Sequence, residues 1–169
     1  MNDDVVVRKK KWTFVPQVAT GWHCPARLHL EHRIAHPTTG SDIFGVLPPI
    51  RIAKKLIFEG GQIVLRYGKH IGDKHSMNGF GFRHIWARRF PEIEDHDTAM
   101  VEVAALVASI IQPGTQIYYE HGDRAAIFCN ANGEVIVEER GAPGDPFYSV
   151  VTAIRHPVQP KGSRVGALR

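Results

Sequence analysis

Apolar residues recur along this chain at two different periods, and the change falls near residue 115. Upstream of it, apolar side chains three and four positions apart predict a helix from Phe82 to Phe90 and a longer one from Met100 to Ile111. Asp97 or Thr98 can cap the longer helix by accepting hydrogen bonds from its free amides. The apolar stripe of the longer helix indicates that it faces the core.

Downstream of residue 115 the pattern changes to runs rich in β-branched and aromatic residues, which are typical of strands. The pair Asn132-Gly133 favours a tight hairpin turn, because both residues tolerate a positive φ. We therefore predict an α+β fold, with an N-terminal extension and helices packed on a four-stranded antiparallel β-meander. The four predicted strands occupy residues 115–120, 124–130, 134–140 and 147–155.

Residues 26–34 alternate between apolar and polar side chains, which is the period of a half-buried strand. This pattern bears on a candidate metal site. His29, His32 and His36 would share a face only if the segment were helical, so the alternation argues against metal binding there.

Residues 37–49 are rich in Pro, Gly, Thr and Ser and predict a loop before the main unit. Ile52, Leu56 and Ile57 suit a short helix, and residues 63–67 suit a strand. The domain boundaries that follow are an extension at 1–59, a main α+β domain at 60–155 and a frayed tail at 156–169.

The chain has 169 residues, which is enough for one domain with a core. It contains no apolar run long enough to cross a bilayer, and its N-terminus lacks the apolar core of a signal peptide. We therefore expect no membrane segment and action in the cytosol. Cys24 and Cys129 are not spaced like a metal or redox pair, so no disulfide framework is expected.

Charge divides unevenly between the two halves of the chain. Residues 1–90 contain 15 Lys+Arg against 6 Asp+Glu, a net charge of +9, while residues 91–169 contain 6 against 11, a net charge of −5. A basic surface attracts polyanions, so nucleic acid is the expected partner. The alternative is a basic tail of no further significance, because Arg8 to Lys11 supply four of the charges.

Most of the candidate chemistry lies between Arg66 and Phe90. This stretch carries His70, His75 and His84 among six lysine and arginine residues. Imidazole exchanges protons near neutrality, and the cations suit a phosphate, so we predict acid–base chemistry on a phosphodiester. His84 and Arg88 are four residues apart and share a face of the predicted helix, where they could approach one phosphate. The alternative is that His84 only covers a solvated face.

The order of these elements resembles the barnase/EndoU/colicin/RelE-like (BECR) superfamily of small RNase toxins, of the phage or polymorphic-toxin type. The resemblance covers residues 60–155 and rests on HIGDKHSMNGFGFRHIWARRF, on the helix ending in IIQPG and on the strands that begin at Arg124 and carry FYSVVTAIR. It implies a cleft between helix and sheet, no cofactor and an acidic immunity or antitoxin partner. The catalytic residues that it nominates are His84, His70, Arg66, Arg124 and Thr152.

Together these features predict a metal-independent endoribonuclease that cleaves RNA, with tRNA among its candidate substrates, to a 2′,3′-cyclic phosphate. The alternative is a nucleic-acid-binding module without catalysis; a metal-dependent nuclease has little support, because no carboxylate-rich metal motif is present. Thr152 and Arg124 also have structural interpretations. Thr152 suits a strand by its β propensity alone, and Arg124 suits a solvated charge at the edge of a strand. The residues expected to bind RNA are Lys69, Lys74, Arg83, Arg88 and Tyr118.

Overall fold

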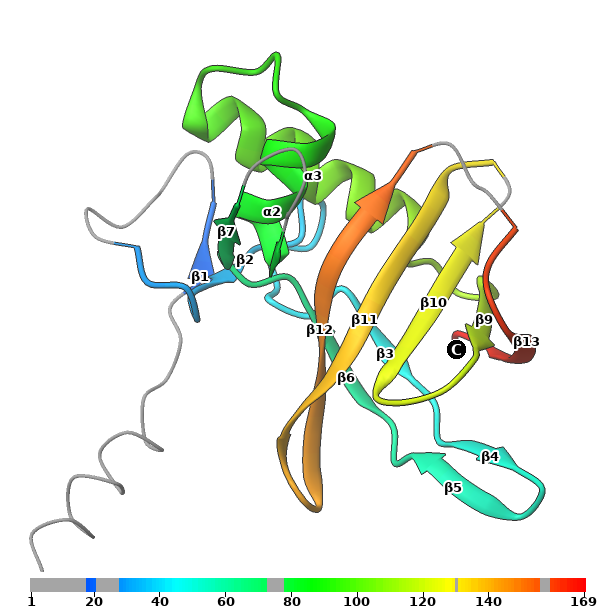
Figure 1. Ribbon diagram of the computed structural model, residues 1–169. Helices are drawn as coiled ribbons and strands as arrows, with labels where there is room; N and C mark the ends of the chain where they lie inside the picture. Colours follow the sequence, from blue (N-terminus) through cyan, green and yellow to red (C-terminus); the bar gives the residue numbers. More distant parts are fainter. Residues whose placement is uncertain (1–17, 21–27, 73–77, 130, 156–158) are drawn as a thin grey trace, which may run out of the picture.

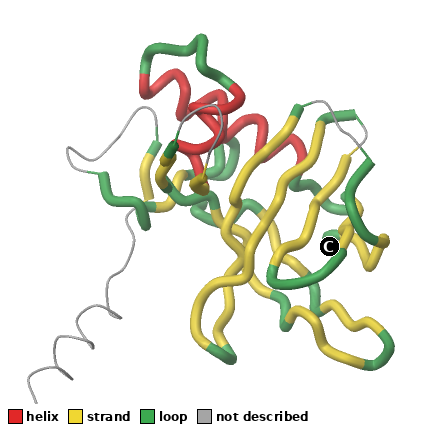
Figure 2. Tube along the Cα trace, viewed as in Figure 1, coloured by secondary structure: helices red, strands yellow, loops and turns green. Residues whose placement is uncertain are grey.

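The computed structural model describes residues 18–20, 28–72, 78–129, 131–155 and 159–169 (Figure 1). Strands dominate this part of the chain, as the tube view shows (Figure 2). In order, the elements are β1 (Val18–Ala19), β2 (Arg33–Ile34), β3 (Gly45–Leu47), β4 (Ile50–Ile52), β5 (Lys55–Phe58), β6 (Gly61–Val64), β7 (Lys69–Ile71), β8 (Asn78–Phe80), α2 (Gly81–Arg89), α3 (His96–Ile110), β9 (Gln116–Tyr119), β10 (Arg124–Cys129), β11 (Gly133–Ala142), β12 (Asp145–Ile154) and β13 (Ser163–Ala167).

Seven strands form one curled mixed sheet in the order β13-β9-β10-β11-β12-β6-β3. Strands β9 to β12 are antiparallel neighbours in chain order. Strand β6, however, joins β12 in parallel, and β3 and β13 extend the sheet at its two ends. The predicted α+β fold on a four-stranded meander is therefore wrong: the protein is mostly β, with two helices among the described residues. Short edge strands such as β3 lack a hydrophobic period of their own, so only pairing reveals them.

The two helices lie together at one end of the sheet and behind it (Figure 1). Helix α3 contacts β10 and β11, and α2 contacts β12. Both helices were predicted, but the cap of α3 was not: Asp95 accepts a hydrogen bond from the Thr98 amide at 2.8 Å. The fully buried side chains that join helices and sheet include Phe82, Ile85, Met100, Val103, Val107, Val135, Val137 and Val150.

Two predictions in the first half of the chain are wrong. The described part of residues 26–34 is mainly loop and turn, and only Arg33 and Ile34 form a strand. The short helix expected around Ile52 is instead the β4–β5 hairpin, whose turn places Ala53 and Lys54 at φ of 49° and 68°. Residues other than glycine rarely adopt this left-handed backbone conformation. The local sequence therefore does not predict the turn.

Three further segments differ from the sequence-based expectation. Strand β3 belongs to the sheet although it lies in the predicted extension, and β13 lies in the predicted frayed tail, where it pairs with β9. Cys129 pairs with Gly133, so Asn132-Gly133 is not a two-residue turn. Among the described residues, no helix has the length and apolar character needed to span a membrane.

Candidate functional site

His70 and His84 lie in direct contact. Their Nδ1 atoms are 3.0 Å apart, and the ring centroids are separated by 5.2 Å. His70 stands on β7 and is half-buried, whereas His84 stands on α2 and is only 4% exposed. The prediction that His84 faces solvent beside Arg88 is therefore wrong. The β7–β8 hairpin covers it so closely that a Cβ at Gly79 would lie 2.9 Å from its Nδ1 atom.

Burial is the largest influence on the protonation of His84. Together with the nearby charges of His70, Arg88 and Arg89, it lowers the pKa of His84 to about 4. His84 is consequently neutral at neutral pH. In a hydrogen bond between two Nδ1 atoms, one ring donates a proton and the other accepts it. Which of the two rings carries that proton depends on the tautomer.

The lowered pKa of His84 makes stability depend on pH. A folded-state pKa of about 4 against 6.5 for an ordinary histidine means that unfolding takes up a proton between these values. His84 therefore does not reduce the free energy of unfolding above pH 6.5. As the pH falls from 6.5 to about 4, protonation of His84 in the unfolded chain lowers the free energy of unfolding by about 3 kcal/mol. Urea denaturation from pH 7.5 to 4 should show this loss. His84→Gln cannot titrate and should lack that part of the loss; equal pH dependence in both proteins would contradict the assignment.

Several cations lie within five residues of His70 or His84 in the sequence, and most of those that the structure describes are exposed. Lys69, Arg83 and Arg88 are exposed, and Arg89 is half-buried with its Nε atom donating to the Ala153 carbonyl at 3.1 Å. The predicted RNA-binding residue Lys74 lies outside the described residues, as does His75. Exposed cations beside an imidazole pair are suited to contact phosphate.

Arg66 is held inside the protein by several contacts. Its Nε atom donates to Ser149 Oγ at 2.7 Å, and Nη1 lies 2.8 and 3.0 Å from the two carboxylate oxygens of Glu31. The guanidinium also covers the Phe80 ring at 4.0 Å from its centroid. With the residue only 6% exposed, burial lowers its pKa, although Glu31 opposes this shift. These contacts indicate a structural role for Arg66.

Arg124 lies on the same face of the sheet as Arg66. Its guanidinium pairs with Glu138 at 3.0 Å, and Glu138 also binds Arg140. Glu138 stands directly opposite Ser149, the residue that accepts from Arg66, and directly opposite residues share a face. The fold thus places Arg66 and Arg124, which are far apart in sequence, on the same face of the sheet.

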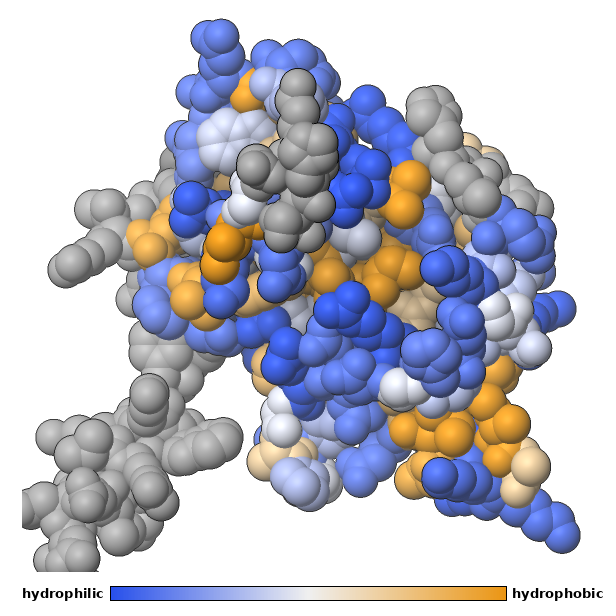
Figure 3. Space-filling view, viewed as in Figure 1, coloured by the Kyte–Doolittle hydropathy of each residue, from blue (hydrophilic) through white to orange (hydrophobic). Residues whose placement is uncertain are grey.

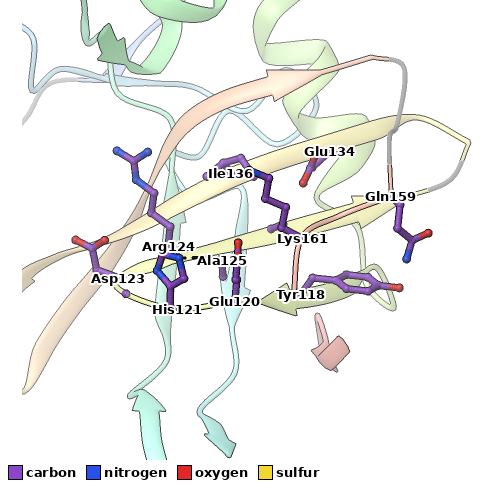
Figure 4. Close-up of a pocket in the computed structure, with 12 residues that line it drawn as sticks. Tyr118, Glu120, His121, Asp123, Arg124, Ala125, Glu134, Ile136, Gln159 and Lys161 are labelled. Carbon is purple, nitrogen blue, oxygen red and sulfur yellow. Dashed lines mark ion pairs between the residues drawn. The ribbon is translucent and has the colours of Figure 1, made fainter. Parts of the chain in front are cut away.

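Arg124 also borders an open cavity of about 550 Å³ on this face (Figure 4). Thr152 stands opposite Ile136, a residue of the cavity lining, and its buried hydroxyl has no partner among the described residues. Tyr118 is less available than predicted, because its hydroxyl binds Gln116 and its ring packs edge-on against Phe128. The cavity lining includes Tyr118, Arg124, Glu134, Ile136, Gln159 and Lys161.

Sequence reasoning missed Glu134. Its carboxylate lines the cavity, the residue is 9% exposed, and burial raises its pKa. In the sequence it is one of many acidic residues and stands at the start of a predicted strand, where no local signal marks it. A carboxyl group with a raised pKa in a cavity is a candidate functional group.

A second histidine contact also went unpredicted. The Tyr67 hydroxyl lies 3.0 Å from Nε2 of His96, whose Nδ1 atom lies 3.0 Å from Asp97. The His96 ring packs among Phe82, Trp86 and Tyr67 at centroid distances of 5.5 to 5.7 Å. Tyr67 and His96 are distant in the chain, so only the fold could reveal this series.

No metal centre is formed by the described side chains, since no group of three or more His, Cys, Asp and Glu residues among them could hold an ion. The Nδ1 atom of His32 accepts from the His29 amide, and that of His36 accepts from the amides of Thr38 and Thr39. Searches for a matching protein family, for similar curated proteins and for similar solved structures found none. The resemblance to the RNase superfamily therefore stays a prediction.

Proposed function

We propose that this protein is a metal-independent endoribonuclease that uses His70 and His84 as its proton-transfer pair. The observation that carries the proposal is the 3.0 Å contact between the two Nδ1 atoms. One member, His70, is half-buried and can reach a substrate, while the other is enclosed and neutral. Exposed Lys69 and Arg88 supply charge for a phosphodiester.

The chemistry follows from the tautomers of the pair. When Nδ1 of His70 donates to neutral His84, Nε2 of His70 carries a lone pair that can accept the proton of an RNA 2′-hydroxyl. The 2′-oxygen then attacks phosphorus, and the bond from phosphorus to the 5′-oxygen breaks. The departing oxygen takes a proton back from the pair. The products are a 2′,3′-cyclic phosphate and a 5′-hydroxyl, and the pair ends with as many protons as it began with.

His84 acts on the substrate through His70 in this scheme. Its ring is enclosed by the β7–β8 hairpin, so it orients its neighbour much as the carboxylate of a catalytic triad orients a histidine. An acidic inhibitor protein that covers Lys69, Arg83 and Arg88 belongs to the same proposal, because a cell that makes an RNase must restrain it.

RNA binding without cleavage is the second candidate function. Arg66 pairs with Glu31 and Arg124 pairs with Glu138. These pairs engage two arginines that were predicted to stabilise the transition state, which favours binding without cleavage. The exposed cations beside the histidines would remain available for phosphate. Such a protein would retain RNA with an affinity that falls steeply with salt.

Incubation of the purified protein with total tRNA and rRNA, with and without EDTA, separates the two candidates. The proposed nuclease cuts in EDTA and leaves 2′,3′-cyclic phosphate ends, because its mechanism uses no metal. RNA that is bound but intact would favour the second candidate. Products with 5′-phosphates that form only with a divalent ion would contradict both.

A further inference from the structure

A groove of about 630 Å³ lies between the β4–β5 hairpin and the end of the sheet at β9 and β13. Three cations line it, namely Arg51 and Lys55 from the hairpin and Arg164 from β13. None of the three forms an ion pair within the described part of the chain, and Glu120 is the one acidic residue of the lining. The groove therefore carries an excess of positive charge without an internal partner.

Apolar side chains stand between these cations. Ile52 is 39% exposed, and Ile57 and Val165 line the same groove at intermediate exposure. In Figure 3 hydrophobic residues gather over the β4–β5 hairpin at the lower right, bordered by hydrophilic ones. An apolar surface rimmed by uncompensated charge is typical of a protein interaction site.

The terminal strand of the seven-stranded sheet borders the groove. Strand β13 is the terminal strand of the seven-stranded sheet and pairs only with β9 within the described chain. Strand β4 lies near β13, but no strand pairing joins the two within the described chain, so backbone N–H and C=O groups of β13 on the side away from β9 lack a strand partner. Such an edge can receive a further strand, with the backbone supplying affinity and alternate side chains supplying specificity.

We propose that this groove docks an extended acidic segment of a partner protein, which adds a strand to the β13 edge. Charge complementarity selects the occupant: Asp or Glu side chains meet Arg51, Lys55 and Arg164, and β-branched side chains between them meet Ile52 and Val165. The proposal is independent of RNA cleavage, because none of its residues belongs to the histidine pair.

Two observations favour a peptide over RNA as the occupant. A strand edge presents acceptors as well as donors, which a peptide backbone satisfies and a phosphate, which only accepts, does not. Single-stranded RNA is normally held by aromatic stacking, whereas the apolar side chains here are aliphatic. The one aromatic residue of the lining, Tyr119, already packs edge-on against Phe58 at 5.4 Å between centroids.

The test uses the ¹⁵N-labelled full chain and an acetylated, amidated peptide of alternating valine and glutamate, followed by NMR at low salt. We expect shifts in the amides of residues 163–165 and 51–57, and none at His70 or His84. Combined Lys55→Glu and Arg164→Glu replacements should weaken binding by about tenfold or more. Lys54→Glu is the matched control: it reverses a charge in the same hairpin, outside the groove lining, and should change binding by less than about threefold.

Three outcomes would overturn the proposal. The first is no shift with the glutamate peptide, and the second is equal binding of a lysine-for-glutamate peptide. The third is competition by a uridine oligonucleotide that shifts the same amides, which would make RNA the occupant. A backbone N-methylated glutamate peptide tests the strand pairing separately, since it keeps the charges but cannot donate hydrogen bonds; it should bind about tenfold more weakly, and equal binding would refute pairing with the edge.

Discussion

Replacing His70 with alanine is expected to lower the rate of RNA cleavage by about 10²- to 10⁴-fold, the range that one positioned proton-transfer group contributes. His70 is the half-buried member of the pair, so its ring can reach a substrate while its Nδ1 atom stays on His84. Its replacement removes the proposed contact with the 2′-hydroxyl but little of the core. Single-turnover cleavage of a defined RNA measures the loss.

The neighbouring replacement Ile71→Ala is the control for this experiment. Ile71 stands next to His70 on β7 and is 55% exposed, so its loss should change cleavage and stability little. His84→Gln should also reduce cleavage, and because the effect passes through His70, the pH dependence of the remaining activity should change with it. Full activity of the His70→Ala protein would show that the pair has no part in catalysis.

Replacing Arg66 with alanine is expected to reduce the free energy of unfolding by about 2–4 kcal/mol, with or without RNA present. The change removes a buried guanidinium and leaves Ser149 and Glu31 without their partner. This loss lies at the lower end of the range for breaking a buried ion pair, because the Glu31 side chain is 35% exposed. Water can therefore replace part of its pairing with Arg66. Urea denaturation measures the difference.

Arg124→Ala is the matched control, because it also removes an arginine that pairs with a carboxylate on the same face of the sheet. The Arg124 side chain is 55% exposed, and Glu138 keeps its contact with Arg140. Its replacement should cost less than about 1 kcal/mol. Similar losses from both replacements would mean that Arg66 does not hold β6, β12 and the segment around Glu31 together.

The helices and the central strands were predictable from local pattern. Phe82 and Ile85 mark one face of α2, and the β-rich runs after residue 115 became β9 to β12, because burial of one face imposes a period that the sequence displays. The β4–β5 hairpin was not predictable. Its turn uses Ala53 and Lys54 in a left-handed conformation where a sequence signal would be Asn-Gly, so the local pattern resembled a short helix.

By itself the sequence named the candidate residues: it placed His70 and His84 in one cationic stretch and predicted the helix that holds His84. Only the tertiary structure decided how these residues are arranged. Antiparallel pairing of β7 with β8 sets His70 opposite Gly79 and folds the hairpin over α2, which buries His84 and lowers its pKa. Likewise, parallel pairing of β6 with β12 brings Arg66 to Ser149. The burial of a side chain and its hydrogen-bond partners depend on segments that are distant in the chain. The local spacing of hydrophobic residues therefore cannot predict them.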